Sequence, residues 1–74
     1  MSKIFKISLK AARVNAGLTV TQAAKLIGIS PTTLIKWEKD SGIVTPNKQL
    51  VIQEVYKFPI DYIFFGNELE LKSS

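Results

Sequence analysis

The sequence contains no cysteine and no histidine among its 74 residues. Without cysteine there is no disulfide and no thiolate metal ligand, and without histidine the commonest general base and metal ligand are missing. These absences exclude every Ser-His and Cys-His catalytic arrangement, so an enzyme is the least expected function class. The four glycines are scattered as turns rather than gathered in a phosphate-binding loop. We therefore predict no catalytic residue, no metal site, no cofactor and no small-molecule ligand.

Long hydrophobic runs are also missing. No apolar stretch approaches the roughly 18 residues that a membrane span requires, and the first ten residues lack the apolar segment of a signal peptide. We therefore expect a cytoplasmic protein that has no membrane partner. A chain of this length has room for one small domain, and its 46% hydrophobic and 22% charged residues indicate a folded one.

The net charge of +4 is unevenly distributed along the chain. Residues 1–48 hold eight basic and two acidic residues, a net charge of +6, whereas residues 49–74 hold two basic and four acidic residues, a net charge of −2. A basic first part and a mildly acidic last part indicate one surface for a polyanion such as nucleic acid and another surface for a different purpose.

Proline and glycine divide the sequence into short helical segments. Thr19 and Gln22 have the Thr-x-x-Gln spacing of a capping box, and Ser30 before Pro31 matches an N-cap followed by the first helical position. Four helices are predicted from these signals and from apolar spacing, over residues 6–16, 20–27, 31–39 and 46–57.

The last part of the chain is expected to form a fifth, short helix and an arm. Gly66 ends a helix over 60–65, and residues 67–72 then alternate polar and apolar as a strand does. The pattern predicts an all-α, five-helix domain over residues 1–66 and a C-terminal arm over 67–74. Facing inward from the fourth helix we expect Leu50, Val51, Val55 and Tyr56, with Ile52 close by.

Residues 20–37 have the spacing of a helix-turn-helix. Two helices of about eight residues joined by only three residues must cross steeply. Ala24 is small enough for the backbones to meet there, and Gly28 tolerates the positive φ that the turn needs. Apolar side chains would fill the angle between the two helices, namely those of Ala23, Ile27, Ile29, Leu34 and Trp37.

Two segments resemble a known family. They are residues 9–40, which read LKAARVNAGLTVTQAAKLIGISPTTLIKWEKD, and residues 58–66, which read FPIDYIFFG, with Pro46 between them. They are similar to the Cro/repressor-type helix-turn-helix proteins of phages and bacteria, also called Xre-like or lambda-repressor-like, over roughly residues 7–66. The sequence departs from the family at Val20, where a phosphate-contacting glutamine is common, and at Pro31, where a polar base-contacting residue is common. The stretch after Pro46 is also slightly shorter.

The resemblance implies a sequence-specific regulator of transcription whose third helix enters the major groove of double-stranded DNA. Phage repressors are themselves the reference case for this docking. Lys36 can donate to guanine, and threonine can exchange hydrogen bonds or contact a thymine methyl group, whereas proline offers only apolar contact. The predicted base contacts are Pro31, Thr32, Thr33 and Lys36. Backbone amides at helix N-termini, hydroxyls and lysines provide the predicted phosphate contacts, from Lys10, Thr19, Thr21, Gln22, Ser30, Lys39, Asn47 and Lys48.

Two further expectations concern packing and assembly. In the family the residues at Arg13 and Glu38 pair between the first and third helices, so the resemblance implies the same pair here. One such domain contacts few base pairs, so a homodimer on an inverted repeat is expected. Its interface is predicted at Tyr62, Phe64, Phe65, Leu69 and Leu71.

Three functions remain open on the sequence alone. The first is a phage or prophage Cro-like repressor, controlled by its own concentration and by competition for the operator. The second is an antitoxin-like regulator of the same fold whose main partner is another protein, bound through Phe64, Phe65 and the acidic tail. The third is an excisionase-like architectural DNA binder.

Overall fold

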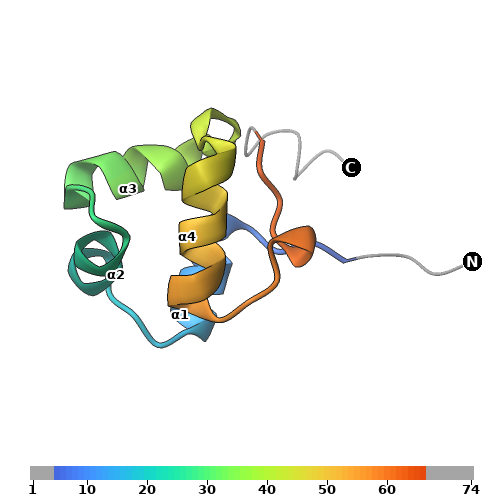
Figure 1. Cartoon of the computed structure of the whole chain (residues 1–74), viewed down its shortest axis with the longest axis horizontal. Helices are drawn as coiled ribbons and strands as arrows, with labels where there is room; N and C mark the ends of the chain where they lie inside the picture. The colour runs from blue at the N-terminus through green and yellow to red at the C-terminus, as the bar shows by residue number, and fades with distance from the viewer. Residues whose placement is uncertain (1–4, 67–74) are drawn as a thin grey trace, which may run out of the picture.

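A computed structural model describes residues 5–66 of the chain, which form four α-helices and two 3-10 turns. In order they are α1 (Leu9–Asn15), α2 (Val20–Ile27), α3 (Pro31–Lys39), the 3-10 turn η1 (Ser41–Ile43), α4 (Pro46–Tyr56) and the 3-10 turn η2 (Ile60–Tyr62). Figure 1 shows α4 between the α2–α3 pair on one side and η2 on the other. The predicted all-α class is confirmed over the described residues.

Side-chain caps fix where the helices begin. The capping box at Thr19 is complete, because its hydroxyl accepts from the amide of Gln22 while the Gln22 side chain accepts from the amide of Thr19. Ser30 caps α3 through the amide of Thr33 at 3.1 Å, and Thr45 caps α4 in the same way. The bounds of α2 and α3 therefore agree with the sequence prediction to the residue.

Both ends of the described chain differ from the prediction. The first helix begins at Leu9 rather than at residue 6, and residues 60–65 form only the turn η2 followed by extended backbone. The reason is a long-range backbone pairing. The amide of Ile7 donates to the Tyr62 carbonyl, and the amide of Phe64 donates to the Ile7 carbonyl, each at 2.8 Å. These bonds form a parallel bridge between Ile7 and Ile63 and replace local helical bonds at both places. The five-helix count is thus not confirmed.

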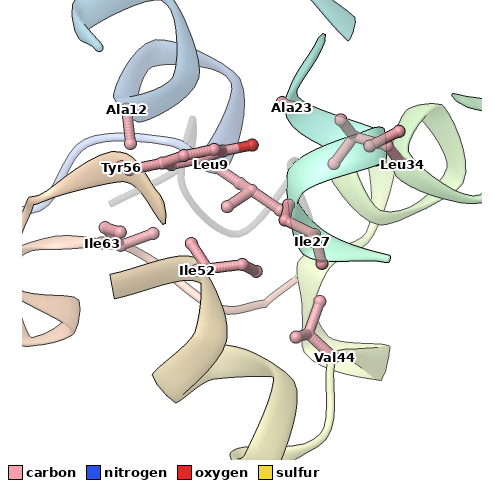
Figure 2. Packing of buried hydrophobic residues seen from close by; sticks show 10 residues of the cluster. Leu9, Ala12, Ala23, Ile27, Leu34, Val44, Ile52, Tyr56 and Ile63 are labelled. Carbon is pink, nitrogen blue, oxygen red and sulfur yellow. The ribbon is translucent and has the colours of Figure 1, made fainter. Parts of the chain in front are cut away.

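Every α-helix contributes to one hydrophobic core (Figure 2). On α4 the buried residues are Ile52 and Tyr56, which lie four positions apart on one face. Leu50, which we expected to face inward, is 54% exposed, because two positions from Ile52 is roughly 200° around the helix axis. The core comprises Leu9, Ala12, Ala23, Ala24, Ile27, Leu34, Val44, Ile52, Tyr56 and Ile63.

Lys57 ends α4 in a left-handed conformation with φ of 52°, although it is not a glycine. That conformation costs an ordinary residue about 1–2 kcal/mol, and the greater unfolded-state freedom of glycine offsets about half of it. We expect Lys57→Gly to raise the free energy of unfolding by about 0.5–1 kcal/mol, measured by urea denaturation. The matched control is Gly28→Ala, which should shift the midpoint in the opposite direction since its φ is 91°. A destabilised Lys57→Gly variant would contradict the prediction.

Candidate nucleic-acid interface

The turn between α2 and α3 sets the position of α3. Gly28 has φ of 91°, and its amide and that of Ile29 both donate to the carbonyl of Ala24, at 2.8 and 2.9 Å. Ala24 is fully buried, so the absence of a larger side chain lets the two helices approach closely at the crossing. Leu34 is fully buried as well, and it anchors the inner face of α3 in the core. The outer face of α3 consequently points away from the domain.

The outer face of α3 brings several of the predicted base-contacting residues together in solvent. The exposed residues of this helix are Pro31, Thr32, Ile35, Lys36 and Lys39. Thr33 differs from the other predicted base contacts, because it is half-buried and its hydroxyl lies 2.9 Å from the Ser30 hydroxyl. Ile35 is 46% exposed and was not among our predicted contacts. Its spacing of four from Pro31 and three from Thr32 is the signal that could have identified it.

The predicted phosphate contacts lie on all four α-helices and on the caps of α2 and α3. Thr21 and Gln22 are exposed in the first turn of α2, and the Gln22 amide oxygen is occupied by the Thr19 amide at 3.0 Å. Because Gln22 is exposed, its side-chain amide nitrogen can serve as a hydrogen-bond donor. Figure 1 shows that the C-terminal end of α3 lies beside the start of α4. Exposed at these two ends are Lys39 and Asn47, with Lys48 half-buried, while Lys10 is exposed on α1.

Residues 1–48 contain two acidic residues, of which Glu38 is held in an ion pair and Asp40 makes a local hydrogen bond. Glu38 accepts from Arg13, and the Asp40 carboxylate accepts from the amide of Gly42 at 3.3 Å. The charge of Glu38 is thus offset by Arg13, whereas the hydrogen bond of Asp40 lies at an exposed position. The lysines exposed on α1, α2 and α3 are Lys10, Lys25, Lys36 and Lys39, and they give this surface its positive field.

Arg13 and Glu38 form an ion pair that joins α1 to α3. The Arg13 Nε atom donates to Glu38 Oε2 at 2.7 Å, and each side chain is only 9% exposed. A second guanidinium nitrogen donates to the Leu18 carbonyl at 2.9 Å, so the arginine also fixes the loop before α2. Charge-assisted bonds of this length are among the stronger ones in proteins. The pair therefore fixes the orientation of α3 relative to the rest of the domain.

A family model described as helix-turn-helix matches residues 9–63, which include all four α-helices. The chain belongs to the Xre/lambda-repressor-like helix-turn-helix family. It is a DNA-binding transcription regulator of the Xre type, and a domain of this kind is regulatory rather than catalytic. No match was found among curated proteins. No helix within residues 5–66 is long and apolar enough to cross a membrane.

One departure from the helix-turn-helix family has a structural consequence. Val20 stands at the first position of α2, where the family often has a glutamine. The valine is half-buried and packs against the core instead of extending toward solvent. Polar donors at the start of α2 are consequently limited to the backbone amides and to Thr19, Thr21 and Gln22.

Tyr56 lies in the core of the helix-turn-helix domain near the Arg13–Glu38 pair. It is 3% exposed, and its hydroxyl has no hydrogen-bond partner among the described residues. Burial, together with the negative charge of Glu38, raises the pKa of Tyr56 to about 12, while Arg13 acts in the opposite direction. The phenol therefore stays protonated in the folded domain at a pH where the unfolded chain has already released its proton.

We expect Tyr56→Phe to raise the free energy of unfolding at neutral pH by about 1 kcal/mol, because an unpaired buried hydroxyl is costly. Above pH 10 the wild-type domain should lose stability, since the unfolded phenol ionises near 10 and the folded one near 12. The contribution of the protonated Tyr56 phenol to the free energy of unfolding is intact below pH 10 and is lost as the pH rises through 12. Urea titrations between pH 7 and 11 should show a smaller loss for the variant. A destabilised variant at neutral pH would indicate that the hydroxyl has a partner.

The predicted dimer residues lie in and after η2. Tyr62 is 45% exposed, and its ring meets that of Phe58 edge-on at 6.3 Å between centroids. Phe64 and Phe65 are both half-buried, and of the two only Phe65 is packed against the core. The other two predicted interface residues, Leu69 and Leu71, lie outside the described residues, as does the predicted arm.

Proposed function

We propose that this regulator is a Cro-like repressor of a phage or prophage that binds an inverted-repeat operator as a homodimer in the cytoplasm. The observation that carries the proposal is the outer face of α3, which exposes Thr32 and Lys36 on a helix whose one carboxylate, that of Glu38, is paired with Arg13. A helix with such a face suits the major groove, and the surrounding lysines suit the phosphate backbone. Residues 1–66 are proposed as the DNA-binding domain and residues 67–74 as an arm.

Lys36 and Thr32 are proposed as the main polar contacts to base edges. Lys36 would donate to guanine O6 or N7, and Thr32 would exchange a hydrogen bond with a neighbouring base. Pro31 would add apolar contact only. Thr33 is proposed as a weaker contact, because its hydroxyl is already paired with that of Ser30.

Phosphate binding is proposed on both sides of α3. On one side the donors are the first turn of α2 and the caps, with Thr19, Thr21, Gln22 and Ser30. On the other side they are Lys39, Asn47 and Lys48, with Lys10 contributing from α1. About four such contacts per subunit would give a salt slope of roughly −3 to −4 on duplex DNA. The expected result is a linear fall of log affinity with log salt concentration.

Selection of bound sequences from a random duplex pool tests this proposal directly. The expected result is an inverted repeat, whose symmetry reports a dimer and whose conserved positions report base contacts. Recovery of unrelated sequences with uniform affinity would favour an excisionase-like architectural role. Weak, salt-sensitive DNA binding without any preferred sequence, together with tight binding to a protein partner, would favour an antitoxin-like role. The exposed ring of Tyr62 could contact such a partner.

The dimer is proposed to form through Tyr62, Phe64 and Phe65, with Leu69 and Leu71 from the arm. Figure 1 shows η2 separated from α2 and α3 by α4, so a dimer joined there would leave α3 free for DNA. We expect Tyr62→Asp to convert the protein from dimer to monomer, measured by sedimentation velocity, because a carboxylate replaces an exposed ring at the interface. Glu54→Asp on α4, which is also exposed, is the control and should remain dimeric. An unchanged sedimentation coefficient for Tyr62→Asp would rule out this interface.

A further inference from the structure

Ile35 is an exposed aliphatic residue of α3 that is not among the described residues packed in or against the core. It is 46% exposed, while its neighbour Leu34 is fully buried in the core. Single exposed aliphatic residues are common on protein surfaces, so exposure alone assigns no role. The position of Ile35 is more informative, because it lies between Thr32 and Lys36 on the outer face of a helix flanked by lysines.

Lys36 is the one side chain near the start of the outer face of α3 that can distinguish a base by paired hydrogen bonds. Bidentate contacts to adenine come from asparagine or glutamine and those to guanine from arginine or lysine. No residue of α3 is an asparagine, a glutamine or an arginine, and its one acidic residue, Glu38, is paired with Arg13. Thr33 is hydrogen-bonded to Ser30. Lys36 and Thr32 are therefore the exposed polar side chains near the start of this face, where the other exposed residues are the aliphatic Pro31 and Ile35.

The aliphatic groups on this face follow the direction of the helix axis. Ile35 is four residues after Pro31 and three after Thr32, so neighbouring Cβ atoms on this stripe are about 5–6 Å apart. Base pairs along the groove are spaced by about 3.4 Å. Aliphatic contacts from one turn of α3 would thus fall on adjacent or next-but-one base pairs. Thymine is the base of unmodified DNA that presents a methyl group in the major groove.

We propose that Ile35, together with Pro31, contacts thymine 5-methyl groups in the major groove and that this apolar contact contributes to the sequence preference of the protein. This inference rests on the proposed function, since it requires α3 to lie in the major groove. It adds an apolar contribution from Ile35 and Pro31 to the hydrogen bonds proposed for Lys36 and Thr32. Discrimination at these positions then depends on the thymine methyl group rather than on a hydrogen bond.

Replacing each thymidine of the selected duplex by deoxyuridine, one at a time, tests the proposal. The replacement keeps base pairing and every hydrogen-bonding group and removes only the methyl group. For the wild-type protein we expect affinity to fall roughly fourfold at one or two positions per half-site, the effect of one buried methyl-sized group. The variant Ile35→Ala should bind the thymidine and deoxyuridine duplexes with equal affinity at the position that Ile35 contacts. The loss of affinity caused by deoxyuridine in the wild type, compared with that in Ile35→Ala, gives the coupling energy between Ile35 and the methyl group.

Val14→Ala is the matched control, because Val14 is an aliphatic residue of α1 that is 59% exposed. It should retain the wild-type preference for thymidine. If no deoxyuridine replacement weakens wild-type binding while the protein still prefers its selected sequence, the methyl contact is wrong and the proposed function stands. If Ile35→Ala keeps the full preference, the methyl group is contacted by another residue and the assignment to Ile35 is wrong. A wild-type protein without any sequence preference would remove both proposals.

Discussion

Replacing Glu38 with alanine should lower the free energy of unfolding by about 3–5 kcal/mol, because the change leaves the Arg13 guanidinium buried without its carboxylate. The two side chains are each 9% exposed and lie 2.7 Å apart, so water cannot easily take the place of the lost partner. A loss of this size is a large part of the stability of a domain this small. Urea and thermal denaturation of the two proteins would measure it.

A double replacement separates the cost of an orphaned charge from the value of the pair. With Arg13→Met and Glu38→Leu together, we expect most of the lost stability to return, because two apolar groups of similar volume leave no unpaired charge. DNA binding by the double variant should remain weaker than that of the wild type, since the carboxylate no longer orients α3 through Arg13. A loss of less than about 1 kcal/mol in the Glu38→Ala variant would mean that the pair behaves as an exposed one.

Replacing Lys36 with alanine should reduce affinity for the selected operator by about tenfold or more, as expected for a lost base contact of about 1–3 kcal/mol. Affinity for random duplex DNA should fall much less, because non-specific binding depends on the total number of phosphate contacts. Lys36 is exposed on α3 and takes no part in the core, so the variant should fold normally. Fluorescence anisotropy with the selected and random duplexes would measure both affinities.

The matched control for Lys36 is Lys25→Ala, which removes an equal charge from the exposed surface of α2. This variant should bind the selected and the random duplex more weakly by a similar factor. The ratio of the two affinities should therefore stay unchanged. If Lys36→Ala also weakened all sequences equally, Lys36 would be a phosphate contact and direct base contact by this residue would be wrong.

The central helices could be predicted from sequence because their limits are set by local chemistry. The capping box at Thr19, the cap at Ser30 and the left-handed glycine at position 28 each act within a few residues of themselves. Such signals need no knowledge of the tertiary structure. For the same reason the crossing of α2 and α3, and with it the outer face of α3, follows directly from the sequence.

The ends of the domain could not be predicted because long-range contacts decide them. Residues 60–65 have the apolar content of a helix, yet the backbone of Phe64 bonds to Ile7. Ser41, after α3, also bonds to this segment, since its hydroxyl donates to the Phe64 carbonyl at 2.9 Å and accepts from the amide of Gly66 at 3.0 Å. These partners are more than twenty residues away in sequence, and local propensity does not register them.

The sequence by itself determined the helix-turn-helix, its caps and the excess of lysine in the first two-thirds of the chain, because all three depend on residue type and short spacing. Only the tertiary structure decided which polar groups remain free on that surface. Packing brings Glu38 to Arg13, 25 residues away in the sequence, and so removes that carboxylate from the exposed surface of α3. An ion pair of this kind joins groups from distant positions in the sequence, so local spacing along the chain does not predict it.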